Sequence, residues 1–168
     1  AAQCHHAIAR CCLAENNIFG SVRSGEDALA MTAANGDWDL KGLILVDLAA
    51  AYGRLHRYPK QARALKRYLG LVEHFNVSRK YMLEAWLGVG AALYRFQEFP
   101  SAILYLSEAL LQAQKAERPE VADKSRRLLR KAMVCAGVLE EIVVDDGSTA
   151  ELGAVIARIR MEGTQEVV

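Results

Sequence analysis

An internal repeat constrains the fold of this 168-residue chain more than any other feature. Segment 48–59 aligns without gaps on segment 89–100, so that small, basic, aromatic and proline positions coincide. The coinciding pairs are Ala50 with Ala91, Ala51 with Ala92, Arg54 with Arg95, Leu55 with Phe96, Tyr58 with Phe99, and Pro59 with Pro100. Amphipathic helices alone do not arrange such coincidences, so the pattern predicts an array of similar structural units.

Each unit is predicted to be a pair of antiparallel helices. Alanine, leucine and arginine dominate the composition, and 12 glycines with three prolines are too few for a sandwich of strands joined by turns. The middle unit is expected to run over 38–56, capped by Asp37, and then from Pro59 to about residue 75. The next unit is expected over 78–96, capped by Ser78, and 100–115. Its inward residues would be Ile103, Leu106, Leu110 and Leu111.

Weaker copies are expected at both ends of the array. Upstream helices are predicted over 3–16 and 24–35, and a first helix of a fourth unit over 118–136. A turn follows at 145–147, and then a single apolar stripe formed by Leu152, Val155, Ile156 and Ile159. The prediction is an all-α, right-handed solenoid over 1–138, with 139–168 forming a turn and a C-terminal capping helix.

The third unit resembles the tetratricopeptide repeat. The first helix supplies Trp86, Val89, Gly90 and Leu93, and the second supplies Ala102, Leu106 and Ala109. The 41-residue period exceeds the usual 34 and is similar to the extended repeats of kinesin light chains, rapsyn and Pins-type scaffolds. The resemblance covers about 3–136. It implies a non-catalytic scaffold for protein–protein interaction, with first helices lining a concave groove, in a cytoskeletal, motor or trafficking assembly. Two alternatives stay open, namely the regulatory arm of a larger enzyme and an inert spacer within a complex.

Arg54, Tyr94 and Arg95 are the candidate groove residues. The two arginines occupy equivalent places near the ends of first helices, so stacking of the units would put them in a row. Guanidinium groups bind carboxylates in fork geometry, and a tyrosine offers a flat amphipathic contact. The alternative is that these side chains brace neighbouring turns. Leu43, Val46, Leu87 and Ala91 stand where chaperone-binding relatives would carry lysine and asparagine, which argues against a clamp for chaperone tails.

Charge is distributed unevenly although the net charge is only +1. Segment 41–80 holds nine basic residues against two acidic ones, whereas segment 139–168 holds seven acidic residues against two arginines. The predicted basic surface consists of Lys60, Arg63, Lys66, Arg67, Arg126 and Arg127. An acidic peptide or helix of a protein partner would suit it, as would an intramolecular contact; a solvated outer face is the alternative. Nucleic acid is disfavoured, because no aromatic residues interleave the basic ones and no known motif is present.

The sequence does not indicate a metal site or a catalytic site. Cys4, His5 and His6 point in different directions on a helix, and no second cluster completes a metal site, so neither metal nor other cofactor is expected. No spacing suggests a nucleophilic triad.

The four cysteines lack paired spacing, which predicts buried free thiols in a reducing, cytoplasmic setting. The longest apolar stretch, 42–52, is interrupted by Asp47 and is too short to span a membrane. The chain lacks an initiator methionine and a secretory signal, and is expected to be a fragment of a longer protein.

Overall fold

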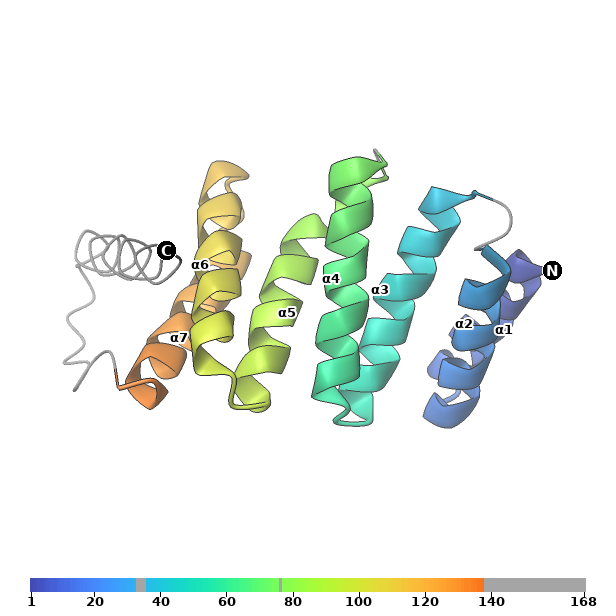
Figure 1. Cartoon of the computed structure of the whole chain (residues 1–168), viewed down its shortest axis with the longest axis horizontal. Helices are drawn as coiled ribbons and strands as arrows, with labels where there is room; N and C mark the ends of the chain where they lie inside the picture. The colour runs from blue at the N-terminus through green and yellow to red at the C-terminus, as the bar shows by residue number, and fades with distance from the viewer. Residues whose placement is uncertain (33–35, 76, 138–168) are drawn as a thin grey trace, which may run out of the picture.

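In the part of the chain that the structure describes, seven α-helices follow one another along the long axis of the molecule (Figure 1). The computed structural model describes residues 1–32, 36–75 and 77–137, and within these ranges it contains no strand. The helices are α1 (Ala2–Ala14), α2 (Ile18–Thr32), α3 (Trp38–Arg54), α4 (Tyr58–His74), α5 (Met82–Arg95), α6 (Phe99–Lys115) and α7 (Pro119–Cys135), with a short 3-10 turn, η1 (Arg79–Tyr81), before α5. Each helix packs against the next along the chain, and α1 also contacts α3, as α5 contacts α7. The prediction of an all-α solenoid of helix pairs is therefore confirmed.

The predicted period appears directly in the helix boundaries. α4 and α6 begin at Tyr58 and Phe99, which are equivalent positions of the repeat, and proline follows each start. The turns that precede these helices also match, because His56 and Gln97 both adopt a left-handed conformation, with φ of 56° and 66°. Asp37 caps α3 as predicted, accepting a hydrogen bond from the Leu40 N–H at 3.0 Å.

Two helix starts differ from the prediction. α2 begins at Ile18 rather than at residue 24, because the Asn17 side chain accepts the Gly20 N–H at 3.0 Å and so satisfies a free donor of the first turn. Gly25 inside this helix allows close approach, since a Cβ there would lie 2.7 Å from Leu48 Cδ2. Ser78 caps η1 rather than α5, with its hydroxyl 3.5 Å from the Lys80 N–H.

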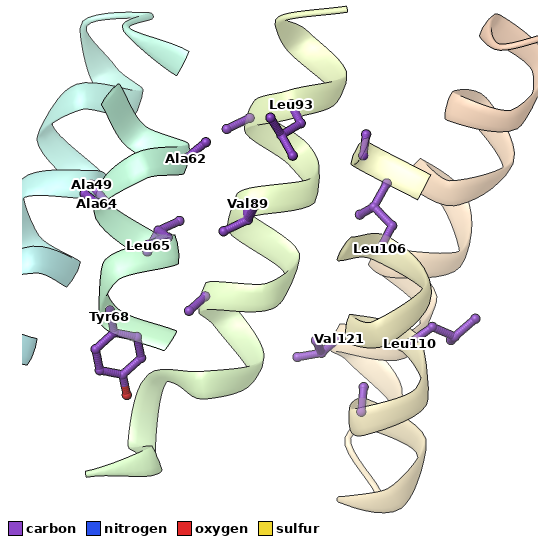
Figure 2. Close-up of a cluster of buried hydrophobic side chains, with 14 of the residues drawn as sticks. Ala49, Ala62, Ala64, Leu65, Tyr68, Val89, Leu93, Leu106, Leu110 and Val121 are labelled. Carbon is purple, nitrogen blue, oxygen red and sulfur yellow. The ribbon is translucent and has the colours of Figure 1, made fainter. Parts of the chain in front are cut away.

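The largest apolar cluster joins α3 through α7 (Figure 2). Leu65 on α4, Val89 on α5 and Leu106 on α6 are buried within it. Gly90 lets α5 and α6 approach, because a Cβ at this position would lie 2.5 Å from Leu106 Cγ. A smaller cluster joins α2 and α3 around Ile44. Shared burial of this kind is what a stack of helix pairs needs, because one pair cannot cover its own apolar stripe.

Two expectations are wrong. Leu111, expected to face inward, is 37% exposed, because the preceding Leu110 is buried and consecutive residues of a helix point about 100° apart. The cysteines are not buried: Cys4, Cys11 and Cys135 are exposed and Cys12 is partly exposed. Three of the four lie on α1, an end helix of the described array, which has neighbours on one side only. The predicted turn and capping helix over 139–168 lie outside the described residues.

Candidate functional site

The outward surface of α3 and α5 carries a repeated stripe of side chains, named here the first-helix face. Exposed or half-buried positions recur at helical spacing on both helices, and each position on α3 has its equivalent one repeat later on α5. The face consists of Leu43, Val46, Ala50 and Arg54 on α3, and Glu84, Leu87, Ala91 and Arg95 on α5. Leu43 leaves 40% of its surface exposed. Glu84, Arg54 and Arg95 are the charged members of the face, and Glu84 Oε1 lies 3.7 Å from Arg118 Nη2. The remaining residues of the face are apolar and are partly or fully exposed.

Polar contacts join α1 to α3 beside this face. His6 is buried, and its Nε2 lies 2.7 Å from Asp47 Oδ2. At the far end of α3, Arg54 Nη1 donates to the Leu13 carbonyl at 3.2 Å. This carbonyl belongs to the last turn of α1 and also accepts the Asn16 N–H at 3.3 Å. In the described ranges, no group of three His, Cys, Asp or Glu side chains comes close enough to hold a metal ion.

Tyr94 and Arg95 contact neighbouring helix ends. The Arg95 guanidinium lies over the Tyr58 ring, 5.4 Å from its centroid, at the start of α4. Tyr94 packs against Phe99, with ring centroids 5.9 Å apart. Burial and the nearby Cys135 thiol at the end of α7 raise the pKa of Tyr94. The structure thus places all three predicted groove residues near the ends of first helices and shows a bracing contact for each; their role in partner binding stays a prediction.

The predicted basic surface divides between two helices. Lys60, Arg63, Lys66 and Arg67 lie on α4, whereas Arg126 and Arg127 lie on α7, which packs against α5 and α6. Some of these cations have partners: Lys60 Nζ lies 3.7 Å from Glu26 Oε1, and Arg126 Nη1 lies 2.7 Å from Asp123 Oδ1. Lys66 Nζ lies over the Tyr105 ring, 4.9 Å from its centroid.

Hollows between successive second helices were not predicted from the sequence. One of about 530 Å³ lies between α4 and α6, over α5, and another of about 430 Å³ adjoins it and shares Lys66. We call these two hollows together the α4–α6 furrow. A third, of about 270 Å³, lies between α2 and α4, over α3. Residues of α4 line all three, so the basic surface of this helix borders recesses rather than a flat outer wall. The sequence could not locate these recesses, because they depend on how far apart successive second helices pack.

A hydrogen-bonded polar pair borders the α2–α4 hollow. The hydroxyl of buried Tyr52 on α3 donates to Glu26 Oε1 on α2 at 2.5 Å. Burial and this hydrogen bond raise the pKa of Tyr52 well above the ordinary tyrosine value of 10.0. The pair ties the first two helix pairs together, and no sequence motif indicated it.

No family model matches the sequence. The structure is similar to the crystal structure of the Sgt2 TPR domain from Aspergillus fumigatus, with a TM-score of 0.57. The two chains are 20% identical, and the match covers 90% of this chain and 93% of that domain. The chain therefore has the tetratricopeptide-like fold that the resemblance of residues 86–109 implied. No helix among the described residues is both long and apolar enough to cross a membrane.

Proposed function

We propose that this chain is a protein–protein interaction module whose first-helix face binds a helix or extended segment of a protein partner. The uncovered apolar stripe on α3 and α5 carries the proposal. Leu43, Val46 and Leu87 stay partly exposed on helices whose other faces are packed. Tetratricopeptide-like arrays use such first helices as a concave surface, and an apolar stripe there suits an amphipathic helix.

The ends of the face favour acidic groups on the partner. Arg54 and Arg95 are exposed near the carboxyl ends of α3 and α5, and each makes one contact that leaves guanidinium N–H groups available. A carboxylate on the partner would add a charge-assisted hydrogen bond at either position. Tyr94 lies beside Arg95 and supplies a flat surface. The partner segment proposed here is apolar along its middle and acidic at the end that reaches these residues.

The wider setting follows from the same resemblance. The spacing between the starts of α4 and α6, at Tyr58 and Phe99, is longer than one ordinary tetratricopeptide repeat, which supports the extended subtype. We extend the proposal to a non-catalytic scaffold in a cytoskeletal, motor or trafficking assembly of the cytoplasm. Free cysteines that are partly or fully exposed are compatible with a reducing compartment. The two alternatives, an enzyme's regulatory arm and an inert spacer, make different predictions in the experiment below.

Two matched variants test the first-helix face. Leu43→Glu places a charge on this face, and Leu104→Glu places the same charge on α6, where Leu104 is 51% exposed. Both proteins would be used as bait in a lysate, after circular dichroism shows equal helicity, and captured proteins would be quantified by mass spectrometry. A partner retained by Leu104→Glu and lost by Leu43→Glu is expected. The triple variant Arg54→Ala, Tyr94→Ala, Arg95→Ala should weaken capture of the same partner.

Other results would select an alternative. An inert spacer predicts that every captured protein is retained by both variants. A regulatory arm predicts that the retained partner, or the remainder of the natural chain, carries a catalytic domain whose activity changes when Leu43 is replaced.

A further inference from the structure

The α4–α6 furrow combines an apolar floor with a basic rim. Its larger hollow is floored by apolar side chains from three helices and edged by two cations. The apolar residues are Leu69, Met82, Trp86 and Tyr105, and the cations are Lys66 and Arg79. The ring centroids of Trp86 and Tyr105 lie 5.4 Å apart, with the rings tilted by 35°, and together they form an aromatic surface that Lys66 Nζ borders from above the Tyr105 ring. Large apolar surfaces edged by charge are typical of sites that bind a partner's side chain.

Gly70 leaves the α4 wall of this hollow bare. Glycine inside a helix costs about 0.5–1 kcal/mol relative to alanine. At Gly90 the glycine is required, because a Cβ would lie 2.5 Å from Leu106. At Gly70 no atom lies within 4 Å of an added Cβ, and its φ is not in the left-handed region. Packing and backbone geometry therefore do not require glycine at this position. The absence of a side chain does, however, leave more room in the hollow for a group of a binding partner.

Positive charge exceeds negative charge along the furrow. Arg63, Lys66 and Arg67 line the smaller hollow, and Glu98 is its acidic residue. Glu73 is the acidic residue of the larger hollow. Within the described part of the chain, no hydrogen bond or ion pair involves Arg63 or Arg67. Their guanidinium groups thus keep their donors available for carboxylates of a partner.

We propose that the α4–α6 furrow binds an acidic peptide segment of a protein partner. The segment places one aromatic or large aliphatic side chain against Trp86, Tyr105 and the bare backbone of Gly70. Its carboxylates lie on Arg67, Lys66 and Arg79. We favour a peptide over a nucleic acid, because four cations against two carboxylates give only a small excess of positive charge for a phosphate backbone, and the chain carries no known nucleic-acid-binding motif. This surface is distinct from the first-helix face and does not depend on the function proposed for that face.

The probe is a fluorescein-labelled dodecapeptide that consists of glutamate with one central phenylalanine. Binding to the full chain would be followed by fluorescence anisotropy. Replacing all glutamates by glutamine should weaken binding about tenfold or more, since the charged contacts are lost. Replacing the phenylalanine by serine should weaken it by a similar factor, since the apolar contact is lost. Raising the salt concentration should also weaken it.

Variants assign the binding to the furrow. Gly70→Leu fills the larger hollow with a good helix former and should weaken binding about tenfold or more. Arg67→Glu should weaken it about three- to tenfold, whereas Arg127→Glu, the same charge change on α7, should alter it less than about twofold. Leu43→Glu on the first-helix face should likewise leave it nearly unchanged. Circular dichroism shows whether each variant is folded, and Gly70→Ala, which strengthens the helix, checks that residue 70 tolerates a side chain.

Four outcomes would overturn the proposal. The first is a folded Gly70→Leu variant that binds the peptide as the parent does. The second is equal or tighter binding of a single-stranded oligothymidylate of the same number of units. The third is peptide binding that tightens more than about tenfold when Glu140, Glu141, Asp145 and Asp146 become glutamine or asparagine, because the chain's own acidic segment would then compete for the furrow. The fourth is self-association of the parent that Gly70→Leu abolishes, which would assign the furrow to a second copy.

Discussion

The first helix and the sixth helix are held in the array by different interactions. α1 buries small and polar side chains, namely Ala2, His6 and Ala9. α6 buries large apolar ones, including Ile103, Leu106 and Leu110. Correspondingly, α1 relies on the His6–Asp47 contact and on the hydrogen bond from Arg54, whereas α6 packs between α5 and α7. A helix that buries little apolar surface depends more on specific polar contacts, and we expect α1 to open at a lower free energy than the centre.

Leu106→Ala tests the central half of this comparison and should have the largest effect. Leu106 is completely buried and touches the α5 backbone near Gly90. We expect a loss of about 3–4 kcal/mol in the free energy of unfolding, because the variant loses transfer free energy and leaves a cavity. Urea denaturation followed by circular dichroism measures this loss. Leu104→Ala, at an exposed position of the same helix, should change stability by less than about 0.5 kcal/mol; similar losses in both variants would contradict the assignment of Leu106 to the core.

Asp47→Ala tests how α1, the terminal helix in this comparison, is held in the array. It leaves buried His6 without its partner, and we expect a loss of about 1–2 kcal/mol. The loss should be local, so amide hydrogen exchange should accelerate across α1 while α4 to α6 stay protected.

A matched control is Asp123→Ala, which removes a contact to Arg126 within α7. It should leave exchange in α1 unchanged. Uniform acceleration of exchange in Asp47→Ala would mean that α1 unfolds together with the centre, and the contrast between the two regions would fail.

These first two variants also separate what the sequence predicts from what it does not. Leu106 was predicted to be buried, because the repeat and the apolar spacing of 100–115 both place it on the inner face. The His6–Asp47 pair was not predicted. The left-handed turn residues after α1 and α3 are Asn16 and His56, 40 positions apart, so His6 and Asp47, which are 41 positions apart, lie one position away from strict equivalence. The period identifies equivalent positions, but whether side chains at or near such positions touch depends on the distance between first helices. The α4–α6 furrow could not be predicted for a similar reason, because its width depends on the distance between second helices.

Tyr52→Phe tests the link between the first two helix pairs. Removing the hydrogen bond to Glu26 should cost about 1 kcal/mol at neutral pH. Burial and this hydrogen bond raise the pKa of Tyr52 in the folded state above 10.0. The unfolded chain therefore loses this proton first, so the contribution is fully present below about pH 10 and decreases as the pH rises further.

The measurement is the free energy of unfolding between pH 8 and pH 11 for the parent and for Tyr52→Phe. The parent should lose stability more steeply above pH 10. Burial also raises the pKa of Tyr68, whose hydroxyl donates to the Ser78 carbonyl at 2.6 Å, so Tyr52→Phe should keep part of the slope. Equal slopes in both proteins would contradict the role given to the Tyr52 hydroxyl.

Gly70→Ala should have the smallest effect on stability, and the opposite sign. Nothing lies within 4 Å of the added Cβ, so the variant should gain about 0.5–1 kcal/mol from the higher helix propensity of alanine. Urea denaturation measures the gain, with Gly90→Ala as the contrasting variant, which should lose stability because Leu106 must move. A gain in the free energy of unfolding for Gly70→Ala would mean that the wall of the furrow carries a residue of low helix propensity, although a side chain at this position would stabilise the protein. A loss would mean that α4 needs glycine for its own packing, and Gly70 would then no longer support a binding role for the furrow.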